Sequence, residues 1–420
     1  MHHHREQPPA MGAAECRPHA LSAPLSAPLS ALTAATVAAL LLGCSAPAGS
    51  IEPSGKDVAE ATGWRTQEVV RGLEHPWAIA WLPDGDALIT ERPGRLRLLR
   101  ADETLAAQPI GGLPQICGSC GQGGLLDVAL HPDFAQNRLV YFTFAQGNGE
   151  RNRTALARGR LTADKTRLTD AAVIFHNADW KSGGQHFGSR LVWLPDGTLL
   201  MSIGDGGNPP VSFDGDNIRK QAQNTGTHFG SVVRLTDTGE APADNPFVDD
   251  PDAKPQLYSY GHRNIQGMVR HPESGRVYAN EHGSRGGDEL NLIQAGDNYG
   301  WPKVTYSNEY WGPPISDIAQ RPDVTDPLVV WTPSKAPSGL TVYTGERFPA
   351  WRGDLFSGAL KFREIRWLSL EGGAIVDEQK LPIGERVRDL RMGPDGELYV
   401  LTDAADGALL RIVPEPTTAN

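Results

Sequence analysis

WAIAWLPDGDALIT, residues 77–90, joins two apolar, β-rich runs through a Pro-Asp-Gly turn. Proline fixes φ at the first corner of such a turn, aspartate accepts hydrogen bonds from the turn's backbone, and glycine supplies a positive φ. The stretch therefore predicts a β-hairpin whose two strands belong to a small antiparallel sheet.

Related stretches recur along the chain. Close copies occupy residues 125–142, 191–201, 268–278 and 390–400, and a degenerate copy with an Arg-Gly-Asp turn occupies residues 349–356. Successive copies lie roughly 43–80 residues apart, which is the range of four-stranded propeller blades with loop insertions. The 47 Gly and 33 Pro, scattered between the apolar runs, exclude a mainly helical fold. We expect an all-β fold, a six-bladed β-propeller with four-stranded antiparallel blades, over residues 66–415.

The N-terminal residues are expected to lie outside the propeller. Residues 31–42 form an apolar run that is too short to span a bilayer but suits the core of a signal peptide, and Gly43-Cys44 follow it. This resembles a bacterial lipoprotein signal, in which the cysteine becomes the lipidated first residue; an ordinary secretory signal is the alternative. We assign residues 1–44 to a leader and residues 45–65 to a flexible tether. The expected location is the periplasm or the outer surface, with membrane contact only through a lipid at Cys44.

The net charge limits the classes of binding partner, and the cysteine spacing limits the cysteine chemistry. The chain has 39 Lys+Arg against 50 Asp+Glu, a net charge of −11, which argues against nucleic acid because phosphate binding needs a basic face. Cys117 and Cys120 form a single CxxC among Gly and Pro residues. That setting favours a structural loop disulfide over redox or zinc chemistry.

A propeller gathers its loops around the mouth of a central channel, so residues that carry chemistry are expected in the segments between the repeated hairpins. His186, in GGQHFGSR at residues 183–190, is placed to act as a general base near neutral pH. A single histidine is more often structural, so this segment alone leaves both roles open. Arg263 and Asn264, in GHRNIQG, offer hydrogen bonds to carbonyl or carboxylate oxygens.

Two further segments carry charge. EHGSRGGDELN, residues 281–291, combines carboxylates with backbone carbonyls in a Gly-rich loop, which suits calcium, although such a loop is more often a solvated turn. Lys361 precedes a strand pattern that places Arg386 and Arg388 on one face. If these three side chains share one cavity, they require an anionic ligand with several carboxylates; otherwise they are surface charges at the rim.

These segments together resemble a known family. QGGLLDVALHPDF, GGQHFGSRL, GHRNIQG, EHGSRGGDELNLI, NYGWP, GALK and RVRDLRMGPDG occur in this order between about Glu74 and Ile412. They are similar to the soluble quinoprotein sugar dehydrogenases of the glucose/sorbosone dehydrogenase family, and within it to the bacterial aldose sugar dehydrogenases. The resemblance implies a six-bladed propeller and the cofactor pyrroloquinoline quinone (PQQ). It also implies oxidation of aldose sugars at the anomeric carbon to the lactone, with electrons passed to an external acceptor.

The resemblance also implies roles for individual residues. His186 would be the base that takes the proton from the anomeric hydroxyl, and Arg263 would assist at the quinone oxygens. The residues expected to hold the cofactor are Arg263, Asn264, Lys361, Arg386 and Arg388.

Two calcium sites are implied in the same way. The backbone carbonyls of Gly283 and Ser284 would bind the cofactor's calcium; family members often have proline at the position of Ser284, a change that a carbonyl ligand tolerates. Glu289 and Tyr299, ten residues apart, match ligands of a second, structural calcium. The residues expected in the substrate pocket are Gln122 and Gln185.

Two other function classes stay open. A calcium-dependent propeller hydrolase, such as a sugar lactonase, would share the fold and the metal but would not need converging cations. A non-catalytic propeller that binds a partner or glycan at the cell surface would use the same residues as a rim. A nicotinamide enzyme is disfavoured, because no GxGxxG follows a predicted strand.

Overall fold

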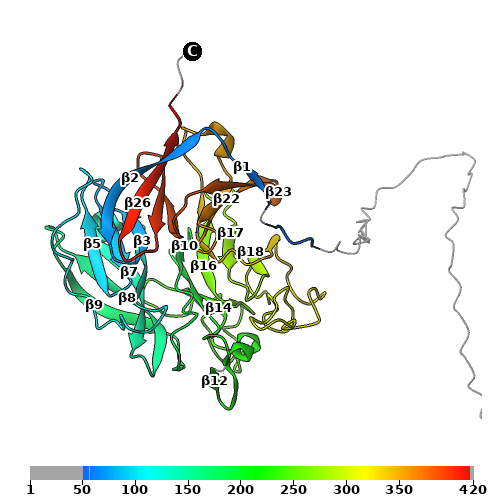
Figure 1. Ribbon diagram of the computed structural model, residues 1–420. Coiled ribbons are helices and arrows are strands. Elements are labelled where there is room, and N and C mark those ends of the chain that lie inside the picture. The colour runs from blue at the N-terminus through cyan, green and yellow to red at the C-terminus, as the bar shows by residue number, and fades with distance from the viewer. Residues whose placement is uncertain (1–50, 56, 210, 417–420) are drawn as a thin grey trace, which may run out of the picture. The chain divides into compact units, whose positions relative to one another are not determined.

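Six small antiparallel sheets form the blades of a six-bladed β-propeller, which confirms the predicted fold (Figure 1). The computed structural model describes residues 51–416, except residues 56 and 210. The predicted leader, including Cys44, lies outside the described residues. None of the helices within residues 51–416 is long and apolar enough to cross a membrane.

The strands follow one another blade by blade along the chain. The first blade consists of β3 (Pro76–Trp81), β4 (Ala87–Glu91) and β5 (Arg95–Leu99). The second consists of β6 (Leu125–Leu130), β7 (Leu139–Gly147), β8 (Asn152–Leu161) and β9 (Leu168–His176). The third consists of β10 (Leu191–Trp193), β11 (Leu199–Ile203), β14 (Ser231–Leu235) and β15 (Leu257–Tyr260). The fourth consists of β16 (Ile265–Arg270), β17 (Val277–Glu281), β18 (Asp288–Ile293) and β19 (Val329–Trp331). The fifth consists of β20 (Pro337–Val342), β21 (Leu355–Ala359), β22 (Glu364–Glu371) and β23 (Ala374–Pro382), and β1 (Ala59–Glu60) joins its outer edge. The sixth contains β24 (Val387–Met392), β25 (Leu398–Thr402), β26 (Gly407–Pro414) and β2 (Trp64–Leu73). The connections contain α1 (Phe134–Asn137), the hairpin β12 (Ser212–Phe213) and β13 (Asp216–Asn217), and the 3₁₀ turns η1 (Ile218–Gln223) and η2 (Pro349–Trp351).

The innermost strands close a ring. Strand β3 contacts β6, and similar contacts link β6 to β10, β10 to β16, β16 to β20, β20 to β24, and β24 back to β3. In the sixth blade β2 pairs with β26 in antiparallel fashion, from Trp64 opposite Pro414 to Leu73 opposite Gly407. A strand from the start of the propeller and a strand from its end therefore complete the same sheet.

Each repeated hairpin joins an innermost strand to the second strand of its blade. In the first copy β3 enters Pro83-Asp84-Gly85, where Gly85 has a φ of +90°, and β4 returns antiparallel to β3. Because the two strands run in opposite directions, the residues before the innermost strand meet the residues after the second strand. The repeated turns therefore lie at one end of the blades, and the segments between the copies gather at the other end.

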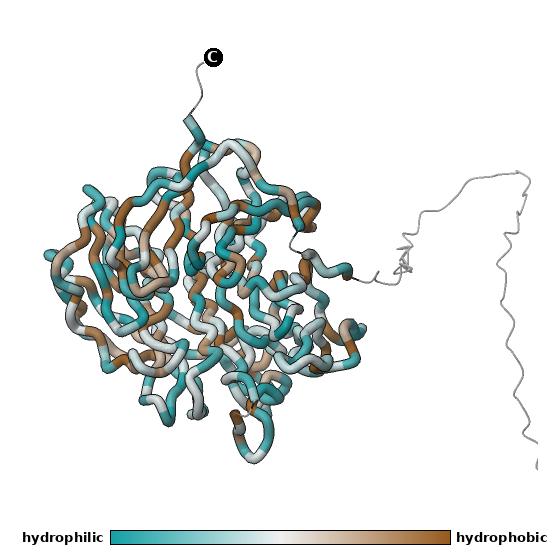
Figure 2. The backbone as a smooth tube through the Cα atoms, viewed as in Figure 1, coloured by the Kyte–Doolittle hydropathy of each residue, from teal (hydrophilic) through white to brown (hydrophobic). Residues whose placement is uncertain are grey.

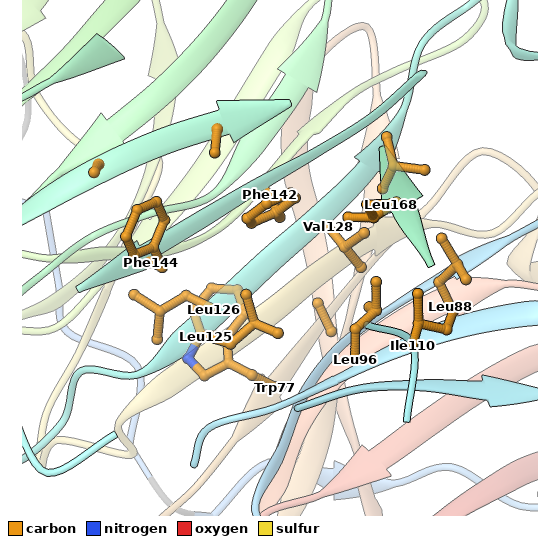
Figure 3. Packing of buried hydrophobic residues seen from close by; sticks show 14 of the residues in the cluster. Trp77, Leu88, Leu96, Ile110, Leu125, Leu126, Val128, Phe142, Phe144 and Leu168 are labelled. Atoms are coloured by element: carbon orange, nitrogen blue, oxygen red, sulfur yellow. The ribbon is translucent and has the colours of Figure 1, made fainter. Parts of the chain in front are cut away.

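The blades pack against each other through apolar side chains. Every residue of β4, β11 and β25 is buried, as expected for a strand covered on both faces. Figure 3 shows the cluster between the first two blades, in which Trp77 and Leu88 belong to one blade and Val128 and Phe142 to the other. In Figure 2 the hydrophobic segments are concentrated in the strands, and the connecting loops are mainly hydrophilic.

Two details differ from the predicted blades and tether. The first blade has three strands, and the fifth has five because β1 pairs in parallel with β23, with Ala59 opposite Gln379. In addition, the amide of Ser54 donates to the carbonyl of Val330 (2.7 Å), which ties this residue to the fourth blade. Part of the segment expected to be a flexible tether is thus hydrogen-bonded to the propeller. A two-residue strand carries no readable alternation, and its pairing depends on the exposed edge of β23.

The contact between the sixth and first blades yields a stability prediction. Leu401 is fully buried on β25, in one cluster with Ile79 and Leu99 of the first blade. Leu401→Ala should lower the free energy of unfolding by about 2–5 kcal/mol, because it leaves a cavity at the junction that closes the ring. Urea unfolding followed by tryptophan fluorescence measures this change. Val376→Ala, at a position that is 53% exposed, should change the stability by less than about 0.5 kcal/mol. Equal effects of the two substitutions would contradict the role given to this junction.

Candidate active site

A cavity lies where the six blades meet, and all six blades contribute to its wall. Its volume is about 180 Å³. We call it the central cavity, and its lining residues are Trp77, Arg92, Gln122, Leu126, Phe187, Gly188, Asn264, Gln266, His282, Ala336, Leu360, Arg386, Arg388 and Asp403. The wall combines apolar side chains with three guanidinium groups and several amides.

β-Bulges at the starts of innermost strands bring side chains into this wall. The register shifts between Pro76 and Ala78 on β3, and the skipped residue, Trp77, lines the cavity. The same irregularity occurs in four other innermost strands, β6, β16, β20 and β24. There the extra residues that line the cavity are Leu126 on β6, Gln266 on β16 and Arg388 on β24. A bulge re-aims a side chain that regular pairing would direct elsewhere.

His186 precedes two lining residues and is held in one orientation. Its Nδ1 lies 2.6 Å from Oδ1 of Asp205, whose other oxygen accepts a hydrogen bond from Nε1 of Trp301 (2.8 Å). Because the carboxylate accepts, Nδ1 carries the proton, and Nε2 makes no hydrogen bond to any other described residue. The backbone of His186 has a φ of +49°, and its amide donates to Oε1 of Gln122 (3.1 Å).

The surroundings of His186 favour a neutral imidazole. Burial lowers its pKa, the guanidinium of Arg263 lowers it further, and Asp205 opposes both effects. A neutral ring with a free Nε2 can accept a proton near neutral pH, and the Asp205 carboxylate stabilises the imidazolium that then forms.

Arg263 and Asn264 are buried next to this histidine segment. The backbone amide of Arg263 donates to Oε2 of Glu281 (2.6 Å), and its Nη1 and Nη2 donate to the carbonyl of His282 (3.2 Å) and to Oδ1 of Asn208 (2.8 Å). Its Nε is buried and has no hydrogen-bond acceptor among the described residues. Oδ1 of Asn264 accepts from the amide of Gly188 (3.1 Å), which joins two segments that lie far apart in the sequence.

The cavity has more cationic than anionic side chains. Arg386 and Arg388 both donate to Oδ2 of Asp403, at 3.2 and 2.9 Å, and Arg92 has no ion-pair partner within residues 51–416. Burial alone would raise the pKa of Asp403, but Arg388, His75 and Arg386 hold it well below its usual value. Three guanidinium groups thus face one carboxylate, so the wall suits a ligand with negative charge.

The other predicted cofactor and substrate residues are placed as follows. Lys361 is exposed and is not among the lining residues, although the neighbouring Leu360 is. Gln122 lines the cavity, whereas Oε1 of Gln185 accepts from the amide of Asn208 (3.1 Å) outside the lining set. The structure therefore brings Arg386, Arg388, Asn264 and Gln122 together, with His186 and Arg263 beside them.

The predicted calcium residues lie near one another around β17 and β18. The amides of Gly283 and Ser284 donate to the side chains of Asp288 (2.7 Å) and Ser307 (3.1 Å). The hydroxyl of Tyr299 donates to the carbonyl of Leu292 (2.6 Å) and accepts from the amide of Gln294 (3.0 Å), so its backbone carbonyl is the better placed oxygen for a cation.

A like-charge pair marks the expected structural site. Glu289 lies opposite Glu281 in the sheet, and burial followed by this neighbouring carboxylate raises the pKa of Glu289 well above its usual range. A cation would relieve this repulsion. Residues 51–416 contain no group of three or more His, Cys, Asp and Glu side chains arranged to hold a metal, and calcium binding stays a prediction.

Sequence reasoning missed Arg92, Asp205, His282 and Asp403. Each of these residues lies just beyond the second strand of its blade: Arg92 and His282 follow β4 and β17 directly, and Asp205 follows β11 after one glycine. A polar residue shortly after the second strand of a repeated hairpin is a signal that could have identified them. The predicted disulfide between Cys117 and Cys120 is present. It lies in the loop that carries Gln122, and the backbone amide of Gln122 donates to the carbonyl of Gly184 (2.7 Å).

His282 makes the stability of the protein sensitive to pH. Its Nε2 donates to the carbonyl of Pro337 (2.7 Å), and burial, followed by the charge of Arg263, lowers its pKa to about 3. Between pH 7 and 5 the unfolded chain protonates this histidine and the folded chain does not, so the stability falls as the pH falls. His282→Gln should reduce this fall by roughly 1–2 kcal/mol, measured by urea unfolding at both pH values. His176→Gln, outside the cavity, controls for the loss of a histidine, and a pH dependence that is the same in both variants would contradict the assignment.

Known proteins with the same architecture identify the family. The glucose/sorbosone dehydrogenase family model matches residues 73–411. The aldose sugar dehydrogenase YliI of Escherichia coli is 41% identical over 348 residues, which cover 81% of this chain and 91% of that protein. A crystal structure of a glucose dehydrogenase has 45% identity and a TM-score of 0.79, with 84% of this chain and all of that chain covered. The PQQ-bound aldose sugar dehydrogenase of Streptomyces coelicolor has 26% identity and a TM-score of 0.67, with the same coverage. The chain thus belongs to the glucose/sorbosone dehydrogenase family, whose aldose and glucose dehydrogenase members are oxidoreductases.

Proposed function

We propose that this protein is a PQQ-dependent dehydrogenase that oxidises aldose sugars at the anomeric carbon to the lactone and passes the electrons to an external acceptor. The observation that carries the proposal is the central cavity. Its wall has an excess of guanidinium groups, and His186, an oriented histidine whose Nε2 is free, directly precedes the lining residues Phe187 and Gly188. A lactonase would not need this excess of positive charge, and a surface binder would not need the oriented histidine.

The residues of the central cavity fit PQQ, a flat quinone with three carboxylates. Arg92, Arg386 and Arg388 would hold the carboxylates, and Lys361 at the rim would add a fourth cation. The apolar side chains of the wall, such as Trp77, would pack against the ring system. When bound, the cofactor supplies a two-electron acceptor for hydride from the anomeric carbon.

The protein's own groups handle the proton and the charge. His186 accepts the proton of the anomeric hydroxyl at Nε2, while Asp205 keeps Nδ1 protonated and stabilises the resulting positive charge. Arg263, whose buried Nε has no acceptor among the described residues, would donate to oxygens of the bound ligand that gain negative charge. Gln122 and Gln185 would bind sugar hydroxyls, since each presents an amide next to the histidine segment.

We also propose two calcium ions. The carbonyls of Gly283 and Ser284 would bind one ion at the cofactor, and Glu289 with the carbonyl of Tyr299 would bind a second ion in the fourth blade. The repulsion between Glu281 and Glu289 supports the second site. The leader supports export to the periplasm or outer surface, with Cys44 as the lipid attachment point; mass spectrometry of the mature N-terminus tests this part.

Reconstitution tests the function directly. Purified protein is incubated with PQQ and CaCl₂, and glucose and other aldoses are offered with an artificial dye acceptor. We expect sugar-dependent dye reduction that needs PQQ, and that weakens when a chelator removes calcium before loading. Absence of sugar-dependent dye reduction in the loaded protein would reject the dehydrogenase proposal. Sugar lactone hydrolysis without PQQ would instead support the hydrolase alternative.

His186 provides the test of the chemical step. His186→Ala should lower kcat by at least about 100-fold, because the proton of the anomeric hydroxyl loses its acceptor. The affinity for PQQ, measured by fluorescence titration, should change by less than about threefold, since the cations that hold it remain. His176→Ala, at the end of β9, is the matched control and should leave kcat unchanged. Full turnover in the His186 variant would remove this residue from the base role.

A further inference from the structure

Two consecutive aromatic side chains stand exposed on the surface. Tyr310 is 56% exposed and Trp311 is 67% exposed, the two highest values among the large hydrophobic residues that the structure describes. Tryptophan is usually largely covered in folded proteins because its indole has a large apolar area. An exposed aromatic pair at one position therefore calls for a functional explanation.

The segment that carries this pair is a braced turn, which we call the aromatic turn (residues 308–314). The amide of Glu309 donates to the carbonyl of Pro313 (2.7 Å), and the amide of Gly312 donates to the carbonyl of Glu309 (3.0 Å). The carboxylate of Glu309 pairs with Arg219 at 2.5 Å, and the backbone of Asn308 pairs with Arg285. These contacts hold the backbone of the turn in place while both aromatic side chains stay uncovered.

The aromatic turn lies beside the groups assigned to the reaction. The hydroxyl of Tyr310 is 3.5 Å from Nη2 of Arg263, and Nη1 of the same guanidinium binds the carbonyl of the cavity-lining residue His282. On the other side, Arg219 lies over the ring of Trp301, whose indole nitrogen binds Asp205. Contacts thus connect the turn both to Arg263 and to the partner of His186. Figure 1 shows the chain around residues 300–330 in yellow, as loops outside the blade strands.

We propose that Tyr310 and Trp311 form a subsite for the sugar unit that follows the oxidised ring, so that the enzyme favours disaccharides and longer aldose-terminated sugars over monosaccharides. This inference rests on the proposed function. The reacting ring must reach His186 and Arg263, and a second unit attached to it then extends outward past Arg263, where Tyr310 lies. A pyranose ring has one face of C–H groups, which packs on an aromatic ring and removes apolar surface from water.

The distribution of polar groups agrees with this assignment. The guanidinium groups of Arg386 and Arg388 and the carboxylate of Asp403 line the central cavity, whereas the aromatic turn exposes two rings beside a single hydroxyl. A sugar unit bound at the turn would be recognised by its shape and its apolar face. Such recognition tolerates different hydroxyl configurations and depends mainly on the presence of a second ring.

The matched pair of substrates is glucose and maltose, compared in the loaded enzyme. Trp311→Ala should raise the KM for maltose about five- to tenfold and change the KM for glucose by less than twofold, with both kcat values preserved. Trp311→Phe should retain most of the maltose preference, since a ring remains. Ile318→Ala removes another exposed apolar side chain, at 44% exposure, and should leave both KM values unchanged. Equal changes for the two sugars, or no change, would overturn the inference.

Isothermal titration calorimetry separates the failure of this inference from failure of the proposed function. Maltose and glucose are titrated into the wild-type protein and the Trp311→Ala variant, each with circular dichroism as a check of folding. Weaker maltose binding in the variant, in a protein that oxidises no sugar, would support the subsite and reject the dehydrogenase. Sugar oxidation with unchanged maltose binding would reject the subsite alone. Size-exclusion chromatography of both proteins is the last control, since a change of oligomeric state with unchanged sugar binding would identify the turn as a protein contact and also reject the subsite.

Discussion

The pairing of β2 with β26 is the constraint on which the rest of this molecule depends. Eight antiparallel residue pairs, from Trp64 opposite Pro414 to Leu73 opposite Gly407, place strands from both ends of the propeller in one sheet. As a consequence β24 contacts β3, and Arg386 and Arg388 from the last blade share a cavity with Arg92 from the first. The apolar cluster around Leu401 is covered only in the closed ring, so hydrophobic burial and assembly of the site are one event.

Antiparallel geometry decides which residues become neighbours within each blade. The residues before an innermost strand meet those after the second strand, and His186 and Asp205 flank β10 and β11 in this way. Bulges then turn single side chains, among them Trp77 and Arg388, into the central wall. The same bulge thus recurs around the ring with a different side chain at each position. In this way a repetitive fold lines one cavity with apolar, amide and charged side chains.

The charges in and around the central cavity suit an anionic ligand and a neutral base. Burial keeps His186 and His282 neutral, and the positive charge of Arg263 acts in the same direction. Asp403 stays ionised between two guanidinium groups, yet the cavity keeps an excess of positive charge. A neutral base beside cations can take up a proton, while negative charge that develops on a neighbouring ligand is stabilised.

The amino-acid sequence by itself determined the hairpins, their number and therefore the six-bladed class, because a Pro-Asp-Gly turn between apolar runs is a local feature. It also pointed to His186, Arg263, Arg386 and Arg388 through the resemblance of whole segments. The pairing of Ser54 and of β1 with the blades, the three-stranded first blade and the positions of Asp205, Asp403 and Arg92 were decided by the tertiary structure alone. These features depend on which residues meet across blades and on small register shifts. No short segment of the sequence determines either of them. Lys361 illustrates the limit: its motif matches the family, but only the folded chain shows that it lies exposed beside the cavity and that Arg92 lines the wall.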